Sequence, residues 1–360
     1  MQGKQAIFRS AMLGMAVGDA MGNTVDRRTL SQICEDYGPH GLLGYDLVNG
    51  YAEVTSYTQI AAFAANGLLL GLTRGQPGKL PGYIGLALKE WSRSQQFSEP
   101  ARNYCWLSTM PELKRRRCMD TCILDALSRG LGTPEDPQYR SKTPSSLTAV
   151  IPVALMSGSL GMSREEVNRL GAQAVALTHG EPEAFLSGAV LTHVLCLLLK
   201  DPKLGLDELL RDTIDAIQMQ FGLTYGQTVY IWELLQCARM LSDTERLNPM
   251  EAMERLRCRT AAEVLAGALY ACATCEGDFD TALITAVNHS GRSAAVGAIT
   301  GAIMSIRSGK EALPEFYLEC LEPAALLTEL ADDMARGCPT DVMSRLFDDE
   351  WDRKYIHGGL

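Results

Sequence analysis

The chain has 360 residues, and its 46% hydrophobic content allows one large domain or two with a sizeable core. Acidic residues number 43 against 33 Lys and Arg, so the net charge of −10 repels phosphate backbones and argues against a nucleic-acid binder. Eleven scattered cysteines, with no signal peptide and no convincing membrane span, predict a cytoplasmic protein with reduced thiols and no membrane partner.

The first expected element is a close-packed helix over residues 5–21. Its apolar positions follow helical spacing, and Gly14, Gly18 and Gly22 recur every four residues, which lets a neighbouring helix approach closely. Asp19 is a lone carboxylate among these small residues. Either it caps an adjacent turn, which the helix-end position favours, or it faces a pocket.

A second buried helix is expected to begin near Thr55. Residues 36–54 are rich in Gly and contain Gly38-Pro39 and Asn49-Gly50, so they are interpreted as a loop. Thr55 or Ser56 then serves as the N-cap, and the apolar run from 60 to 72 predicts a helix that lies in the core.

Residues 83–131 are predicted to be helical and are more polar than the helix before them, with Trp91 and Trp106 as expected packing anchors. Three prolines in 132–146 indicate an internal loop of one domain. The basic run 114–117 is interpreted as a solvated helix face without an assigned function.

Helices dominate the second half as well. A helix is expected over 147–155, a capping box over 163–166 opens the next one, and Pro182 suits the first turn of a long helix after the break at Thr178-His179-Gly180. Further helices are expected at 207–219, 226–241, 250–257, 261–275, 280–287, 322–335 and 340–347. No stretch shows sustained alternation or a βαβ rhythm, so the predicted fold class is all-α, a single compact domain with more than ten helices.

Residues 286–302 combine a polar loop with a helix of small residues. Asn288, Ser290 and Gly291 form the loop, and from Ala294 onward no charge occurs before Arg307. Such a helix must be buried, and its first N–H groups point toward whatever lies beside the loop. His289 lies on this loop and is therefore the better candidate for a functional histidine. His179 is expected to fix a loop by hydrogen bonds.

The cysteines give no metal site by spacing. Cys272 and Cys275 are three apart and Cys118 and Cys122 are four apart, but neither pair has a partner pair at zinc spacing. Buried thiols on helices explain them better.

Several stretches together resemble the ADP-ribosylglycohydrolase family. The segment FRSAMLGMAVGDAMGNTVD resembles the opening helix of that family. Its T-D-D-T motif followed by Gln, its T-H-G element, its A-L-Y helix and its G-D-x-D-T motif correspond in order and spacing to residues 55–59, 178–180, 268–270 and 291–295. The resemblance is clearest over residues 6–306.

This resemblance implies a fold and a chemistry for the whole chain, residues 1–360. Family members have an all-α fold with a pair of Mg²⁺ or Mn²⁺ ions in a central cleft, and they hydrolyse the bond between ADP-ribose and an acceptor group. Transferred to this chain, the cleft would be lined by Asp19, Thr55, Ser56, Tyr57, Thr58, His179, Asn288, His289, Ser290, Gly291, Arg292 and Ser293.

The departures from the family fall on its acidic motifs. Ser56 and Tyr57 replace the two acids of the first motif, while Arg292 and Ala294 replace those of the second. Hard divalent cations need oxygen ligands and usually carboxylates. An Arg at about 4 Å from a dication would cost roughly 8 kcal/mol at an effective dielectric of 20. The family's metal pair is therefore expected to be absent, with Arg292 paired to an acid such as Asp19, Asp26 or Glu53.

A further departure lies at residues 148–152. The family has a Gly-rich loop leading to M-R-x-x-P, and this chain keeps Pro152 but has no arginine in the run from Thr148. A contact on the substrate side is therefore altered too.

Three functional hypotheses follow. The chain retains a cleft for an ADP-ribose-like small molecule, a nucleotide or an ADP-ribosylated protein, without metal-dependent hydrolysis. Alternatively, it is a metal-free glycoside hydrolase that uses carboxylates, drawn from Asp19, Asp26, Asp46 and Glu53 and assisted by Tyr57 or His289. The third hypothesis is a protein-interaction scaffold, in which Tyr57 and Arg292 pack together and fill the cleft.

Overall fold

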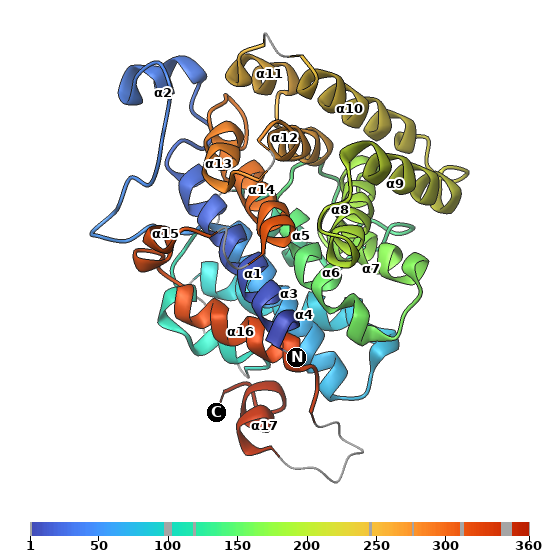
Figure 1. Ribbon diagram of the computed structural model, residues 1–360. Helices are drawn as coiled ribbons and strands as arrows, with labels where there is room; N and C mark the ends of the chain where they lie inside the picture. Colours follow the sequence, from blue (N-terminus) through green and yellow to red (C-terminus); the bar gives the residue numbers. More distant parts are fainter. Residues whose placement is uncertain are drawn as a thin grey trace.

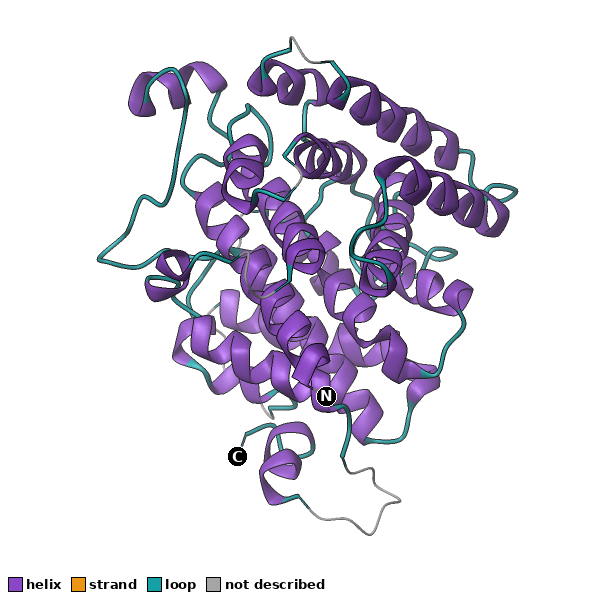
Figure 2. Ribbon diagram, viewed as in Figure 1, coloured by secondary structure: helices purple, strands orange, loops and turns teal. Residues whose placement is uncertain are grey.

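The computed structural model describes residues 2–96, 103–117, 120–244, 247–275, 277–309, 313–339 and 348–359. Within these ranges the chain forms 17 α-helices and four short 3₁₀ helices, with two isolated β-bridges and no β-strand (Figure 2). The all-α prediction is confirmed.

The helices of the first half are α1 (Gln2–Asn23), α2 (Leu30–Tyr37), α3 (Ser56–Thr73), α4 (Leu80–Gln95), α5 (Cys122–Arg129), α6 (Val150–Leu160), α7 (Arg164–Ala176) and α8 (Pro182–Lys200). Those of the second half are α9 (Leu206–Phe221), α10 (Gln227–Ser242), α11 (Pro249–Leu256), α12 (Ala261–Thr274), α13 (Phe279–Val287), α14 (Ser293–Ser308), α15 (Glu315–Glu319), α16 (Ala324–Arg336) and α17 (Asp349–Tyr355).

The helices α1 and α14 form the central pair of the molecule and lie side by side in the middle of Figure 1. Their backbones touch: a Cβ at Gly18 would lie 1.9 Å from the carbonyl oxygen of Gly297, and one at Gly301 would lie 2.0 Å from that of Gly14. Only glycine permits this approach, so the predicted close-packed helix is confirmed. Around this pair, α16 packs on α1, while α12 and α13 pack on α14.

Helix α3 begins where the sequence predicts. The side chain of Thr55 is the N-cap and accepts a hydrogen bond from the backbone N–H of Tyr57, as its residue type favours. Every residue from Ser56 to Gly71 is buried. Because the helix is apolar on all sides, it can only be stable inside the core, where it packs against α4 and α6.

The region 83–131 differs from the prediction. Helix α4 ends at Gln95, and the described residues after it form two 3₁₀ turns before α5. The buried carboxylate of Glu90 holds this irregular segment, because it accepts hydrogen bonds from the backbone N–H groups of Tyr104 and Cys105 at 2.5 and 3.0 Å. Trp91 and Trp106 are buried, as expected of packing anchors.

Three short helices were not predicted, namely α2, α15 and α17. The first of them has a local signal, because Thr29 and Gln32 form a complete capping box at its start. The helix expected at 340–347 lies outside the described residues.

Helix α8 is the one described helix that is long and apolar enough to cross a membrane by composition. In the fold, 89% of its apolar window is buried inside the protein. It is therefore a core helix here, contacting α6, α7 and α9.

Candidate functional site

The carboxylate of Asp19 lies at the start of α3 and is fully buried. It accepts hydrogen bonds from the backbone N–H groups of Thr55 and Thr58 at 2.9 and 3.0 Å, and from their hydroxyls at 2.6 Å each. The first N–H groups of a helix have no partner within it, so Asp19 supplies one from α1. Its interpretation as a cap is confirmed.

Burial raises the pKa of Asp19 to about 6, although all four hydrogen bonds lower it. The raised value would suit a general acid. However, the four donors occupy both carboxylate oxygens, and the side chain has no exposed surface. Asp19 therefore holds α1 and α3 together.

Tyr57 lies in the first turn of α3 with 1% of its surface exposed. Its backbone carbonyl accepts a hydrogen bond from the hydroxyl of Thr148 at 2.7 Å, whereas its phenol oxygen has no hydrogen-bond partner among the described residues. Burial raises the pKa of Tyr57 well above its ordinary value, the charge of Asp26 adds to the effect, and the charge of Arg292 opposes it. The ring is neutral and fills space, as the sequence suggested.

The loop before α14 is held by its own polar side chains. Asn288 is fully buried: its amide oxygen accepts from the N–H of Leu42 at 2.8 Å, and its amide nitrogen donates to the carbonyls of Leu42 and Ile284. The hydroxyl of Ser290 accepts from the N–H of Leu30. These residues fasten the loop to residues 30–42, so their polar atoms serve the fold.

His289 is also fully buried and not on an open face. Its Nδ1 accepts a hydrogen bond from the N–H of Gly291 at 2.9 Å. Burial lowers its pKa to about 4, opposed by the backbone carbonyl of Ala286. The histidine that the sequence singled out as the better functional candidate of the two is thus a neutral group that shapes its own loop.

Arg292 projects from the N-cap position of α14 toward two carboxylates. Its Nη2 lies 3.5 Å from Asp120, and its Nη1 is buried without a hydrogen-bond partner among the described residues. Asp26 accepts from the N–H of Ala294 at 3.1 Å and lies 3.4 Å from Arg27. We call Asp26, Tyr57, Asp120 and Arg292 the Arg292 cluster.

Charges within this cluster influence one another. Burial raises the pKa of Asp26, and the N–H of Ala294 and the charge of Arg292 oppose that rise. Burial also acts to raise the pKa of Asp120, but Arg292 and hydrogen bonds from Cys122 and Ser145 outweigh it, so the pKa lies below its ordinary value. The carboxylate in direct contact with Arg292 is thus Asp120, a residue that was not among the acids considered from the sequence.

His179 is buried in a network of hydroxyls. Its Nδ1 lies 2.9 Å from the oxygen of Ser146 and 2.8 Å from that of Thr178, and its Nε2 lies 3.0 Å from that of Thr143. Burial lowers its pKa to about 4, against the charge of Asp120. His179 is a loop-fixing hydrogen bonder, as predicted.

A polar surface continues from this network to the Arg292 cluster. Cys122 lies 3.2 Å from the hydroxyl of Thr143, which lies 3.1 Å from that of Ser141. These side chains, with Asp120 and Arg292, are partly exposed, and we call the five residues the polar rim. Apart from Arg292, the members of the rim lie in no motif that the sequence analysis identified, so the sequence alone did not predict that they lie together.

Glu53 lies in a different cluster. It pairs with Arg117 at 2.5 Å and with Arg115 at 3.6 Å, and Glu322 pairs with the same two arginines at 3.2 and 2.8 Å. The hydrogen bond from Arg117 lowers the pKa of Glu53. The prediction that the basic run 114–117 forms a solvated helix face is wrong. The run lies in a loop, where two of its arginines pair with these acids.

Ser56, Tyr57, Arg292 and Ala294 stand at the positions that the sequence resemblance sets against the family's acidic motifs, and none of these four side chains is a carboxylate. Ser56 is 3% exposed and Ala294 is fully buried. In the described part of the chain no group of three or more His, Cys, Asp or Glu side chains is arranged to hold a metal ion.

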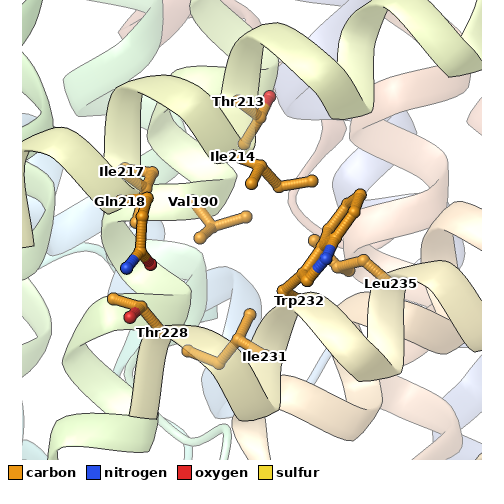
Figure 3. A pocket seen from close by; sticks show the side chains of 9 residues that line it. All are labelled: Val190, Thr213, Ile214, Ile217, Gln218, Thr228, Ile231, Trp232 and Leu235. Carbon is orange, nitrogen blue, oxygen red and sulfur yellow. The ribbon is translucent and has the colours of Figure 1, made fainter. Parts of the chain in front are cut away.

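The hollow shown in Figure 3 lies away from these residues, between α8, α9 and α10. It is mainly apolar, with Val190, Ile214 and Trp232 among its walls, and its free volume of about 20 Å³ suits roughly one water molecule. A shallower hollow of about 300 Å³ opens beside the Glu53 cluster, lined by Tyr51, Pro111, Glu112, Arg115 and Glu322.

The geometry can now be set beside known proteins. The family model described as ADP-ribosylglycohydrolase matches residues 2–342, nearly the whole chain. The chain belongs to the ADP-ribosylglycohydrolase family. The match extends the sequence resemblance at both ends.

A solved structure titled "ADP-ribosylglycohydrolase-related protein complex" has the same fold. Its TM-score is 0.55 at 21% sequence identity, and the alignment covers 94% of this chain and 100% of that one. Comparison with curated proteins gives no match. Family and fold are therefore shown, and the activity of this member rests on its own site.

Proposed function

We propose that this ADP-ribosylglycohydrolase family member binds an ADP-ribosyl or nucleotide group without metal-dependent hydrolysis. The observation that carries the proposal is the Arg292 cluster. Arg292 stands where the resemblance places an acid of the family's second motif, and its guanidinium lies 3.5 Å from the carboxylate of Asp120. Two divalent cations do not fit the residues present, because the aligned positions offer no carboxylate and add a positive charge.

The polar rim supports ligand binding. Hydroxyls of Ser141 and Thr143 and the carboxylate of Asp120 suit the hydroxyls of a ribose, and the partly exposed guanidinium of Arg292 suits a phosphate. Such a ligand would be a free ADP-ribose-like molecule or the modified side chain of a partner protein.

Metal-free hydrolysis has less support. Three of its four carboxylates are engaged elsewhere: Asp19 caps α3, Glu53 pairs with two arginines, and Asp46 accepts a hydrogen bond from Tyr37 at the surface. The fourth, Asp26, has a fully buried side chain. Cleavage of a glycosidic bond needs an acid and a base on either side of one bond. These three residues lie in separate environments.

A scaffold role is favoured by one observation. Tyr57 is almost completely buried, and only 18% of the Arg292 side chain is exposed, so the interior part of the site is largely filled. A small ligand could then bind only at the polar rim. If the rim binds no ligand, protein interaction is the function that remains of the three considered.

The test is calorimetric titration of the full chain with ADP-ribose, in EDTA and in Mg²⁺ or Mn²⁺, beside an assay for release of ADP-ribose from modified protein. We expect binding of similar affinity in all conditions and no release. The variant Thr143→Val should weaken binding at least about fivefold, since it removes a rim hydroxyl. The matched control is Thr244→Val, which changes an exposed threonine two residues after the end of α10.

Tight metal binding that raises the affinity for ADP-ribose, or metal-dependent release of ADP-ribose, would contradict the proposal. Absence of ADP-ribose binding in every condition would favour the scaffold. Release in EDTA would favour metal-free hydrolysis.

A further inference from the structure

Arg292 is held in an unusual way for an arginine with only 18% of its side chain exposed. Among the residues that the structure describes, its one close carboxylate contact is to Asp120 and measures 3.5 Å, longer than the 2.7–2.9 Å typical of charge-assisted hydrogen bonds. Its Nη1 makes no hydrogen bond with any described residue. The guanidinium is thus placed by charge attraction, with little contribution from the bidentate geometry that distinguishes arginine from other cations.

The charges around it are mostly negative. Asp26 has a fully buried side chain, and Asp120 is 16% exposed. Both experience the positive charge of Arg292, as does the phenol of Tyr57. Arg27 also lies near Asp26, at 3.4 Å, but its side chain is 45% exposed and therefore more strongly screened by water.

We propose that the guanidinium of Arg292 is a built-in cation that balances the carboxylates of Asp26 and Asp120, so that this member's site keeps its structure without a divalent ion. The inference rests on the proposed function, because it takes the family's metal pair to be absent. It goes further in assigning Arg292 the charge-balancing part of a metal's role.

A charge-balancing role for Arg292 determines which replacements are tolerated. If charge matters more than hydrogen-bond geometry, lysine at position 292 should serve nearly as well as arginine. Alanine would leave the carboxylates of Asp26 and Asp120 without this cation in a largely buried site, where their poor solvation destabilises the fold. A small dication that enters the space left by the side chain would restore the balance, because it prefers carboxylate oxygens.

The experiment measures melting temperatures of the full chain and of three variants, Arg292→Ala, Arg292→Lys and the double variant Asp120→Asn with Arg292→Ala. Each is measured in EDTA and in 5 mM Mn²⁺, a concentration of about the size needed to saturate a weak site. In EDTA, R292A should melt at least about 4 °C below wild type. In Mn²⁺ it should recover half or more of that loss.

The other proteins act as controls. Wild type and R292K should melt alike and should not respond to Mn²⁺. The double variant should be more stable than R292A in EDTA and should lose the response to Mn²⁺, because one of the two carboxylates is no longer charged. If R292A is too unstable to purify, recovery of folded R292K and of the folded double variant under the same conditions still supports charge balance, and failure of both to fold contradicts it.

The inference is overturned if R292A is as stable as wild type in EDTA, if Mn²⁺ raises R292A no more than the double variant, or if R292K is as unstable as R292A. Failure of the proposed function has a different signature. In that case wild type itself would be stabilised by Mn²⁺, which is measured without any variant.

Discussion

At the scale of single residues, burial and partners decide what each carboxylate does. Asp19 and Glu53 both belong to loops or helix ends beside the expected site, and the sequence treats them alike. In the structure, burial raises the pKa of Asp19 to about 6, while the hydrogen bond from Arg117 lowers that of Glu53. The first is a cap inside the protein and the second belongs to an ion cluster near its surface.

The raised pKa of Asp19 makes a prediction about stability and pH. Folding favours the protonated form, so the contribution of this group to stability is complete below the ordinary value of 3.8 and is lost as the pH rises through about 6. A pKa rise of about two corresponds to about 3 kcal/mol. Relative to Asp19→Asn, wild type should therefore lose about this much unfolding free energy between pH 4 and pH 7.

Urea unfolding over a series of pH values measures this difference. Asp46→Asn changes an exposed carboxylate and should leave the pH dependence of wild type in place. A constant difference between wild type and D19N from pH 4 to pH 7 would contradict the assignment of Asp19 as a buried titrating cap.

At the scale of elements, the pairing of α1 with α14 organises the molecule. The glycines of one helix lie against backbone atoms of the other, so the two axes come closer than any larger side chain would allow. Helix α1 carries Asp19 and α14 begins at the Arg292 loop. The close contact therefore brings the start of α3 and the start of α14 to the same part of the molecule.

Gly18→Ala tests this contact. The added methyl group would lie 1.9 Å from the carbonyl oxygen of Gly297, and the neighbour is backbone that cannot rotate away. We expect a loss of at least about 3 kcal/mol of unfolding free energy, at the upper end of overpacking effects. Chemical denaturation of the purified variant measures it.

Gly158→Ala is the matched control. Gly158 also lies in a helix, α6, but a Cβ there would meet nothing within 4 Å. This variant should be as stable as wild type or more stable by up to about 1 kcal/mol, because alanine favours a helix. Equal effects at the two positions would show that the helix contact does not determine the loss.

At the scale of the whole molecule, the Glu53 cluster joins distant parts of the chain. Arg117 bridges Glu53, in the loop before α3, to Glu322, just before α16. The backbone reinforces the link, since the N–H of Ala52 donates to Cys320 and that of Glu322 donates to Ala52. Thus the C-terminal part closes over the segment that leads into α3.

Arg117→Ala should weaken this closure. Only 13% of the Arg117 side chain and 8% of the Glu322 side chain are exposed, so Arg117 is the better-shielded cation of the cluster. Its removal leaves Glu53 and Glu322 to Arg115, whose side chain is 59% exposed and whose charge is more strongly screened by water. We expect a loss of about 2–4 kcal/mol in thermal or urea unfolding. The loss should be accompanied by faster proteolysis near residues 313–323.

Arg28→Ala is the control for Arg117. Arg28 pairs with Asp36, whose side chain is 58% exposed, so its loss should cost less than about 1 kcal/mol. A similar loss in both variants would contradict a special role for the buried cluster.

The sequence by itself determined the helical fold and most helix starts. Caps and periodicity act over a few residues, so Thr55, Ser163 and the glycine spacing of α1 are informative without a tertiary context. Segments without such signals, such as 103–117, depend on a distant group like Glu90 and were misjudged as helix.

Only the tertiary structure decided the partners of the candidate site residues. Arg292 and Asp120 are separated by 172 positions, and Arg117 and Glu322 by 205. No local pattern specifies such pairs, because they depend on how the helices pack. Burial has the same origin: His289 lies in a polar loop by sequence, yet packing removes it from solvent and lowers its pKa to about 4.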